Sequence, residues 1–278
     1  MRLGGPVPAA SNDVDGWISA LKARGYSAAY SPVEETDDEA LIAAIARAAE
    51  AAGIVIAEVG AWSNPLSPDP EERKKAIARC QKSLWVADRM GARCAVNIAG
   101  SRGMQWDGPD ARNLTQETFD LVVESVRGII DAVKPTRTFY TLEPMPWMYP
   151  DSPDNYLRLV RAINRKTFGV HLDPVNMVNT PRKFYRSGEL IRECFAKLGP
   201  YIRSCHAKDM TLSGKLTLHL DEARPGLGGI DYRKYLTEAE KLAPDTPVLL
   251  EHLKQEDDYN LAAGYIRQVA REAGVRIK

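Results

Sequence analysis

The sequence predicts an α/β protein, a single-domain (β/α)8 TIM barrel over residues 1–278. Three observations support this fold class. Short apolar segments alternate eight times with longer segments of helical periodicity. No linker rich in Ser, Gly or Pro divides the chain. The length of 278 residues is also close to the ~250 residues that are typical of such barrels.

Eight short segments have the apolar or β-branched composition of buried strands, and each is bounded by polar residues, Gly or Pro. In chain order, strands are expected near Leu3–Val7, Ala28–Ser31, Ile54–Val59, Cys94–Ile98, Phe139–Glu143, Phe168–Asp173, Ile202–His206 and Val248–Glu251.

The segments between these strands carry apolar residues at spacings of three and four, as amphipathic helices do. Pro70 with the acids around it marks a helix start, and Gly53, Gly91 and Gly274 follow helix ends. In chain order, helices are expected near 13–24, 38–52, 70–90, 116–133, 152–165, 187–198, 231–242 and 258–273.

A doubly wound open sheet is the alternative to a barrel. That fold usually has a G-x-G-x-x-G turn after its first strand. Gly4-Gly5-Pro6 does not match this turn. The barrel is therefore the preferred interpretation.

Composition argues against two classes of partner. The chain has 37 Lys and Arg against 37 Asp and Glu, so it has no net field to attract nucleic acid or an anionic membrane. No apolar run reaches the ~20 residues of a membrane span, and the N-terminus lacks the apolar region of a secretory signal. The four cysteines are widely spaced, which favours reduced thiols. These features predict a soluble, cytoplasmic protein.

Polar residues close four consecutive strands in the second half of the chain. Active sites of such barrels lie at the carboxyl ends of the strands, so these side chains should meet at one rim. The four residues are Glu143, Asp173, His206 and Glu251.

Three carboxylates and one imidazole suit one six-coordinate divalent ion, namely Mn²⁺, Mg²⁺ or Co²⁺. The absence of thiolates argues against a closed zinc site. Three ionised carboxylates a few ångströms apart would also repel each other unless a cation or protons intervened. The constellation therefore predicts a metal site.

Strand alternation separates the histidines. His171 shares a face with Asp173, so it should point inward one layer below it. His252 is adjacent to Glu251 and is expected to point away from the barrel axis. His219 lies in an apparent strand or loop, 215–220, and cannot be oriented from the sequence.

These motifs resemble the xylose isomerase-like TIM-barrel superfamily of sugar isomerases and epimerases over nearly the whole chain. The motifs are Leu142-Glu143-Pro144, His171-Leu172-Asp173-Pro174, His206-Ala207-Lys208-Asp209, Pro225-Gly226-Leu227-Gly228-Gly229-Ile230-Asp231-Tyr232 and Leu250-Glu251-His252. The resemblance implies one catalytic divalent metal, with Mn²⁺ favoured, on the four predicted ligands.

The resemblance also implies a ketose 3-epimerase-like reaction on a small sugar or sugar derivative. A metal chelated by the sugar carbonyl and its neighbouring hydroxyl stabilises a cis-enediolate. Glu143 and Glu251 would act as base and acid on opposite faces, which inverts a carbon centre. Proton return to the neighbouring carbon by one base would instead isomerise the sugar.

Further residues are candidates for substrate binding. By resemblance, Lys208 contacts substrate oxygens, although a salt bridge at the rim is equally compatible with its position. Arg224 could hold a hydroxyl, carboxylate or phosphate, and the glycines after it could form a phosphate nest. Trp62, Trp106, Trp147 and Met148 fall in loops after the third, fourth and fifth strands, where aromatic rings can face a sugar or simply pack the loops.

One departure from the family pattern leaves the reaction open. Ketose 3-epimerases commonly have a His three residues after the metal-binding Asp, where this chain has Asn176. Asn cannot shuttle a proton near neutral pH, whereas the inward-facing His171 could supply an imidazole. A lyase or dehydratase acting on keto-sugars, keto-inositols or 3-keto glycosides is therefore the second hypothesis.

Two other functions are weaker interpretations. An apurinic endonuclease would need a multi-metal cluster with many His ligands, and the chain has four His in all. A binding module would have no reason to gather three carboxylates. Dimers or tetramers are common among similar proteins, and the apolar loop residues are compatible with a homo-oligomer.

Overall fold

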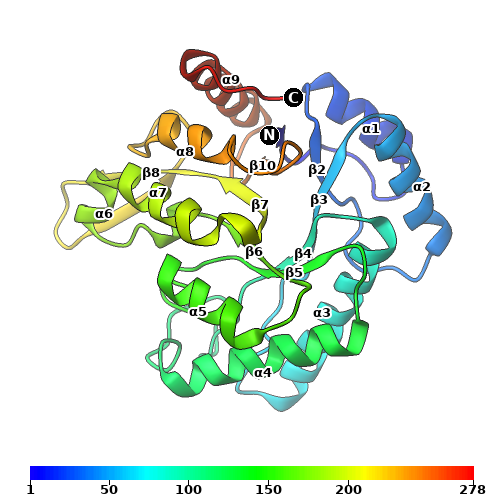
Figure 1. Ribbon diagram of the computed structural model, residues 1–278, viewed down its shortest axis with the longest axis vertical. Helices are drawn as coiled ribbons and strands as arrows, with labels where there is room; N and C mark the ends of the chain where they lie inside the picture. Colours follow the sequence, from blue (N-terminus) through cyan, green and yellow to red (C-terminus); the bar gives the residue numbers. More distant parts are fainter.

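Eight parallel strands close into a barrel in the computed structural model, which describes residues 1–278 (Figure 1). Around the barrel the order is β1-β10-β7-β6-β5-β4-β3-β2. The strands are β1 (Arg2–Gly4), β2 (Ala28–Tyr30), β3 (Val55–Gly60), β4 (Cys94–Asn97), β5 (Phe139–Leu142), β6 (Phe168–Leu172), β7 (Ile202–Ala207) and β10 (Pro247–Leu250).

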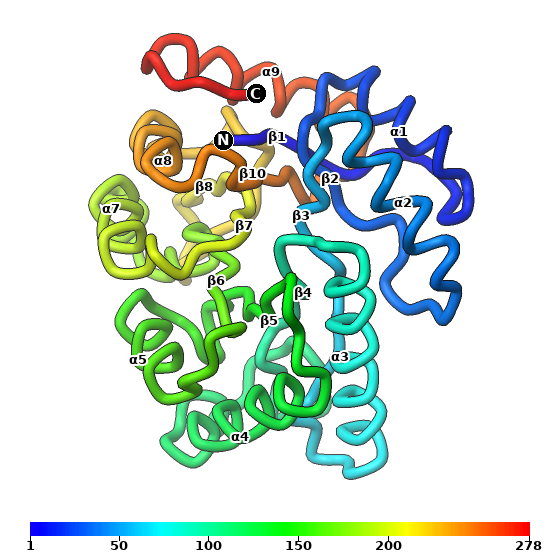
Figure 2. Tube along the Cα trace, turned by 45° about the vertical axis from the view of Figure 1, so that its right-hand side comes forward, coloured from blue at the N-terminus to red at the C-terminus, as the bar shows by residue number.

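Helices follow the strands and surround the barrel (Figure 2). Most of them begin at a side chain that accepts a hydrogen bond from a free N–H group of the first turn, as Asp69 does at α3 and Thr115 at α4, whereas α7 and α9 have no such cap. The helices are α1 (Val14–Ala23), α2 (Glu39–Ala51), α3 (Pro70–Met90), α4 (Gln116–Val133), α5 (Pro153–Ile163), α6 (Pro181–Tyr185), α7 (Ser187–Leu198), α8 (Tyr232–Ala239) and α9 (Glu256–Ala273).

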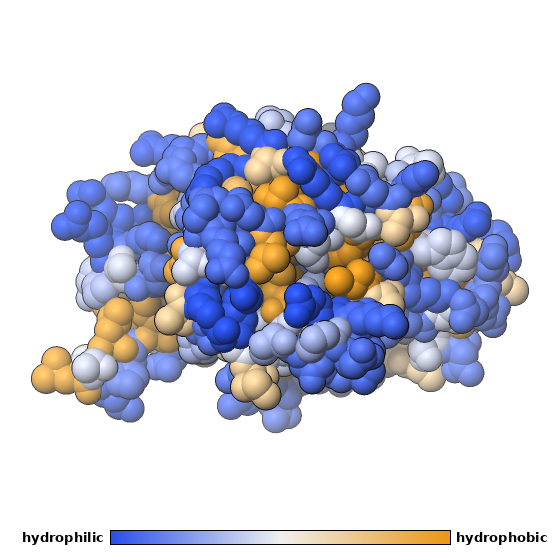
Figure 3. All heavy atoms as spheres, turned by 90° about the horizontal axis from the view of Figure 1, so that it is seen from below, coloured by the Kyte–Doolittle hydropathy of each residue, from blue (hydrophilic) through white to orange (hydrophobic).

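The main hydrophobic core includes buried side chains from all eight barrel strands and from the inner faces of the helices. Hydrophilic residues cover most of the face in Figure 3, and hydrophobic atoms lie mainly in hollows between them. The chain ends meet, because the N–H of Lys278 donates to the carbonyl oxygen of Met1 at 3.0 Å. No helix is both long enough and apolar enough to cross a bilayer.

The predicted barrel is confirmed, and several strand ends differ from the prediction by one residue or more. β5, β6 and β10 stop at Leu142, Leu172 and Leu250, so the predicted carboxylates lie one residue beyond the sheet. β1 ends at Gly4 and does not reach Val7. The Glu143 N–H still donates to the Asn97 carbonyl of β4 at 2.7 Å, and β7 runs one residue past its predicted end, to Ala207.

The short helix α6 was not predicted. An antiparallel hairpin formed by β8 (Asp209–Ser213) and β9 (His219–Ala223) was not predicted as such either, although an apparent strand or loop was noted at 215–220. The hairpin stands outside the barrel, and its second strand is largely exposed. It therefore lacks the buried apolar run by which the barrel strands were recognised.

The glycine-rich segment after the hairpin is held by the chain's own carboxylate. Asp209 accepts hydrogen bonds from the N–H groups of Gly226 and Gly228 at 3.0 Å, and from Ile230 at 3.1 Å. A Cβ at Gly228 would lie 2.1 Å from Asp209 Oδ1, so only glycine fits there. These N–H groups already donate to Asp209, so they do not form the phosphate-binding nest that the glycines suggested.

Tyr156 of α5 ties together the strand ends that carry two of the carboxylates. Its buried hydroxyl accepts hydrogen bonds from the N–H groups of Leu142 at 3.3 Å and His171 at 3.1 Å, and donates to the carbonyl of Leu142. The ends of β5 and β6 are thus fixed just before Glu143 and Asp173.

We expect Tyr156→Phe to lower the free energy of unfolding by about 1–3 kcal/mol, because it leaves buried backbone groups without this partner. Urea unfolding measures the change. Tyr185→Phe is the matched control, since Tyr185 is 77% exposed and should have no effect. An unchanged unfolding midpoint in Tyr156→Phe would contradict this role.

Candidate active site

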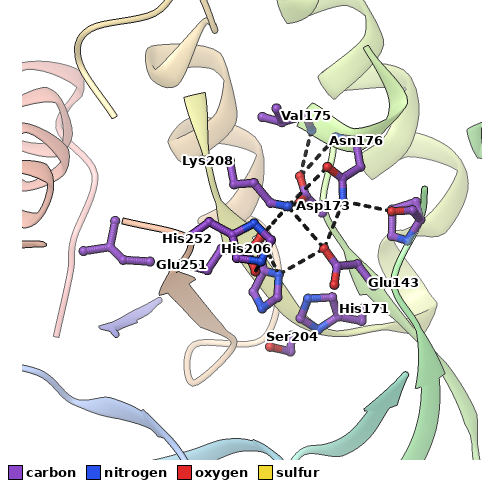
Figure 4. Close-up of polar contacts among 12 residues, drawn as sticks. Glu143, His171, Asp173, Val175, Asn176, Ser204, His206, Lys208, Glu251 and His252 are labelled. Atoms are coloured by element: carbon purple, nitrogen blue, oxygen red, sulfur yellow. Dashed lines mark hydrogen bonds and ion pairs between the residues drawn. The ribbon is translucent and has the colours of Figure 1, made fainter. Parts of the chain in front are cut away.

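The four predicted metal ligands meet at the carboxyl end of the barrel (Figure 4). One ligand atom from each lies within 4.8 Å of the corresponding atom of every other. Three of the residues follow β5, β6 and β10 directly, and the fourth belongs to β7. In barrel order they are Glu143, Asp173, His206 and Glu251, and all are buried.

The ring of His206 lies between the carboxylate cluster and a further acid, Glu58, which is deeper in the barrel. Its Nδ1 lies 2.9 Å from Glu251 Oε1 and 3.4 Å from Glu143 Oε1. Its Nε2 lies 3.2 Å from Glu58 Oε1. When Nε2 carries a proton for Glu58, Nδ1 offers its lone pair to a cation at the upper cluster.

Glu58 is a site residue that the sequence reasoning missed. It is 1% exposed on β3, where Oε2 accepts a hydrogen bond from the Ser204 hydroxyl at 3.2 Å and lies 3.2 Å from His171 Nδ1. The available signal was one acid inside the apolar run Ile54–Val59. It was overlooked because only residues that close a strand were considered.

Lys208 enters the middle of the carboxylate cluster (Figure 4). Its ammonium nitrogen lies 2.7 Å from Glu251 Oε1, 2.9 Å from Asp173 Oδ2 and 3.5 Å from Glu143 Oε1. It also donates a hydrogen bond to the Asn176 side-chain oxygen at 3.2 Å. This buried cation offsets part of the negative charge at the site.

The pKa values of these groups follow from burial and from their neighbours. Burial lowers the pKa of Lys208, but attraction to Asp173, Glu251 and Glu143 outweighs it and leaves the pKa well above its ordinary value. Burial raises the pKa of Asp173 to about 7 against the attraction of Lys208.

The pKa of His171 is shifted downward, in contrast to that of Lys208. Burial, together with the neighbouring His206, lowers its pKa to about 4. Its ring is therefore neutral near pH 7. It lies beside His206, beneath the predicted metal ligands, and does not line the cavity.

The donor set fits a divalent metal ion. Asp173 Oδ2 and Glu251 Oε1 are buried and accept no hydrogen bond of ordinary geometry, although the Lys208 ammonium is close to both. Three carboxylates and one imidazole nitrogen are the ligands that Mg²⁺, Mn²⁺ and Co²⁺ accept. The same cluster without a cation would concentrate negative charge in a buried volume.

Asn176 takes part in this network as a hydrogen-bonding residue. Its amide nitrogen donates to Glu143 Oε1 and to the Pro144 carbonyl, both at 3.0 Å. The amide therefore orients Glu143 and the Lys208 ammonium.

The expectation that His252 points away from the site is wrong. The strand ends at Leu250, and His252 has a positive φ of 55°, so strand alternation does not apply to it. Its Nδ1 lies 3.1 Å from Glu222 Oε1 of β9, and its Nε2 lies 3.6 Å from Glu251 Oε2. His252 and Glu222 both line the cavity above the metal ligands. Glu222 was not predicted, because it belongs to the unpredicted hairpin.

Other candidates divide between the cavity and its surroundings. Trp62, Trp106 and Trp147 line the cavity. Arg224 does not, because its Nε lies 3.4 Å from Asp258 Oδ1 outside it. His219 is exposed on the hairpin.

The cavity above the cluster has a volume of about 650 Å³, within the range of small-molecule sites. Its polar lining includes Glu143, Asn176, Lys208, Glu222, Glu251 and His252, and most of its remaining lining is apolar. The arrangement can hold a small molecule against a polar floor.

Comparison with known proteins identifies the kind of barrel. The family model described as xylose isomerase-like TIM barrel matches residues 13–269. A search of curated protein sequences finds no significant match.

Three similar solved structures share the fold. A xylose isomerase-like TIM barrel protein from Mycobacterium smegmatis in complex with magnesium is 18% identical, with 97% of this chain and 94% of that chain covered and a TM-score of 0.67. D-psicose 3-epimerase from Clostridium cellulolyticum, with D-tagatose, is 17% identical, with coverage of 98% and 99% and a TM-score of 0.70. Endonuclease IV from Thermus thermophilus is 16% identical, with coverage of 98% and 100% and a TM-score of 0.76. At these identities the likeness shows the fold and leaves the reaction open.

We expect His206→Ala to weaken Mn²⁺ binding by at least ~10-fold, because the imidazole nitrogen lies among the carboxylate oxygens. His252→Ala should weaken it much less, since His252 is 58% exposed at the rim. Calorimetric titration of the two metal-free variants compares them. Equal losses would show that His252 also holds the ion.

Glu58→Gln should weaken Mn²⁺ binding by ~10–100-fold although Glu58 is not one of the four predicted ligands, because the amide no longer fixes the proton on His206 Nε2. Ser204→Ala, which removes only a hydrogen bond to Glu58, is the matched control and should cost less. Wild-type affinity in Glu58→Gln would show that Glu58 only fills space.

Proposed function

The chain belongs to the xylose isomerase-like TIM-barrel family, and we propose on this basis that it is a divalent-metal-dependent enzyme that epimerises or isomerises a sugar or sugar derivative. The observation that supports this most directly is the order of the site residues around the barrel. Glu143 and Glu251 flank Asp173 and His206, because β5 and β10 lie on either side of β6 and β7. A sugar bound over the cluster would have one glutamate at each side.

The metal ion would be held by Glu143, Asp173, His206 and Glu251, with Mn²⁺ favoured. Such an ion polarises a carbonyl and stabilises the negative charge that develops on its oxygen. The chain's own residues carry the proton. One glutamate takes it from the carbon beside the carbonyl, and the other delivers a proton to the opposite face.

Lys208 and Asn176 would bind oxygen atoms of the substrate. The side chain of Lys208 is only 4% exposed, and its ammonium can neutralise charge on a substrate oxygen in a water-poor site. Asn176 can hydrogen-bond a hydroxyl while it holds Glu143 at 3.0 Å. Trp62 and Trp106 would cover the bound molecule from the loops after β3 and β4.

A metal-dependent lyase or dehydratase is the second candidate. Asn176 favours elimination. Ketose 3-epimerases commonly have a proton-transferring His at this position, and the Asn side chain cannot transfer a proton near neutral pH. After the same deprotonation, a group on the next carbon would leave, and no epimer would form. An endonuclease is not proposed, because only one histidine belongs to the upper cluster and the chain has no net positive charge.

Deuterium exchange tests the shared step. Mn²⁺-loaded protein is incubated in D₂O with free ketoses (D-fructose, D-tagatose, D-psicose, pentuloses) and with 3-keto glucosides. Deuterium beside the carbonyl with a new epimer supports epimerisation, and a released leaving group supports elimination. No deuterium uptake in any of these compounds would exclude both candidates.

Glu143→Gln and Glu251→Gln should each reduce turnover by at least ~10²–10⁴ while the barrel stays folded, because an amide cannot accept the proton. Steady-state rates and circular dichroism measure the two properties. Glu117→Gln is the matched control, since Glu117 lies on α4 with its side chain 75% exposed and does not line the cavity. Near-normal rates in either glutamine variant would remove that glutamate from the mechanism.

EDTA should abolish activity, and Mn²⁺ or Co²⁺ should restore it better than Ca²⁺. Ca²⁺ prefers 6–8 oxygen ligands at about 2.3–2.6 Å, whereas a site with an imidazole favours smaller transition ions. The ion should also raise the melting temperature by binding the native state. Full activity in protein shown by elemental analysis to be metal-free would refute the metal-dependent mechanism.

A further inference from the structure

We infer that the substrate joins a carbonyl-bearing sugar ring to a flat apolar group, and that the apolar wall of the active-site cavity binds this group. The inference rests on the proposed function, because it takes the sugar end to lie at the metal cluster. It commits to an aromatic keto-glycoside as the class of substrate, in place of a free ketose or a sugar phosphate.

Polar and apolar residues are largely segregated in the cavity. Most of the polar side chains form one connected network on the floor, since Lys208 contacts Glu143, Glu222, Glu251 and Asn176. Asp107 and Asn179 are the lining polar residues outside this network. The apolar residues around this floor come mainly from the loops after β3, β4 and β5 and from the β8–β9 hairpin.

One wall consists of three indoles from successive loops. Trp62, Trp106 and Trp147 follow β3, β4 and β5. Trp147 Nε1 donates a hydrogen bond to the Asp107 carbonyl at 2.7 Å, which joins two of the loops and leaves this N–H unavailable to a substrate hydroxyl. Trp106 and Trp147 remain 40% and 38% exposed, a large apolar surface for residues that line a concave site.

The hairpin contributes a second wall, which is aliphatic apart from Glu222 at the floor network. Met210 lies on β8 and Leu220 on β9, while Leu218 precedes β9 and is 48% exposed. None of these side chains has an N–H or O–H group that could donate a hydrogen bond to a substrate hydroxyl. Leucine side chains also lack the flat ring that stacks on a sugar.

This division of the cavity selects against a free ketose. Such a sugar has a hydroxyl on nearly every carbon, and hydroxyls turned to the apolar walls would lose water without gaining partners. A phosphate would find no cation on the walls, because Arg224 is paired with Asp258 outside the cavity. A flat apolar group instead gains by leaving water and stacking on indoles.

The rival explanation is that the indoles stack on the C–H face of the sugar itself. In that case an aromatic group on the substrate would add nothing. Removing an indole would also weaken aromatic and non-aromatic glycosides equally. The two explanations therefore predict different ratios of affinity between an aromatic and a non-aromatic glycoside.

The experiment measures binding of phenyl β-D-glucoside and methyl β-D-glucoside to Mn²⁺-loaded protein by calorimetry, and kcat/KM for their 3-keto forms. We expect the phenyl compound to bind at least ~10-fold more tightly, with a similar ratio in kcat/KM. Trp147→Ala should remove most of this ratio, and Trp147→Phe should restore part of it. Trp85→Ala is the matched control, because Trp85 lies on α3 outside the cavity and should leave the ratio unchanged.

Equal affinity for the two glucosides, or equal loss of both in Trp147→Ala, would overturn the inference. A different result is expected if the proposed reaction is wrong but the aromatic preference is right. The phenyl glucoside then still binds more tightly, and no keto compound takes up deuterium from D₂O. Efficient turnover of free ketoses with no phenyl preference would sustain the proposed function and reject the aromatic substrate.

Discussion

The structure depends on a single electrostatic constraint, the burial of three carboxylates around one point. Glu143, Asp173 and Glu251 are each at most 9% exposed, and such a cluster is tolerated only with compensating positive charge. The chain supplies part of it through Lys208 and His206. Lys208 lies 2.9 Å from Asp173 Oδ2 and 2.7 Å from Glu251 Oε1, so these oxygens face a cation of the chain without forming hydrogen bonds of ordinary geometry to it. A divalent ion is the species whose charge and ligand preferences match what is missing.

The carboxylate cluster is connected to the layer of residues below it in the barrel through His206. One ring nitrogen of His206 faces the cluster, and the other faces the buried Glu58. A neutral His171 packs edge-on against His206, with the ring centroids 4.0 Å apart. It fills the floor without adding a positive charge that would compete for Glu58. The floor thus fixes the orientation of the one nitrogen ligand, while Tyr156 fixes the strand ends that carry two of the oxygen ligands.

The parts predicted from sequence were those governed by simple periodicity. Alternating strands and helices indicated the barrel, and the polar residues closing its strands indicated the ligands, because both rules depend only on neighbours along the chain. Glu58 was missed since its role depends on a contact across the barrel with β7. His252 was placed wrongly because a positive φ just after β10 turned it toward Glu222. Arg224 was included on sequence proximity alone, and its pairing with Asp258 of α9 is a tertiary contact.

The division of labour in this barrel explains why the fold alone does not identify the reaction. The strands place the carboxylates and the imidazole, and in the proposed mechanism these groups determine where a proton is taken from a carbon beside a carbonyl. The loops after β3, β4 and β5 and the β8–β9 hairpin build the walls, and they determine which molecule can lie there. A strand framework shared with an epimerase and an endonuclease can therefore serve different substrates. In this chain the three indoles and the hairpin leucines are the residues that distinguish the cavity walls, whereas the candidate ligands beneath them bear, in the proposed function, on the chemistry alone.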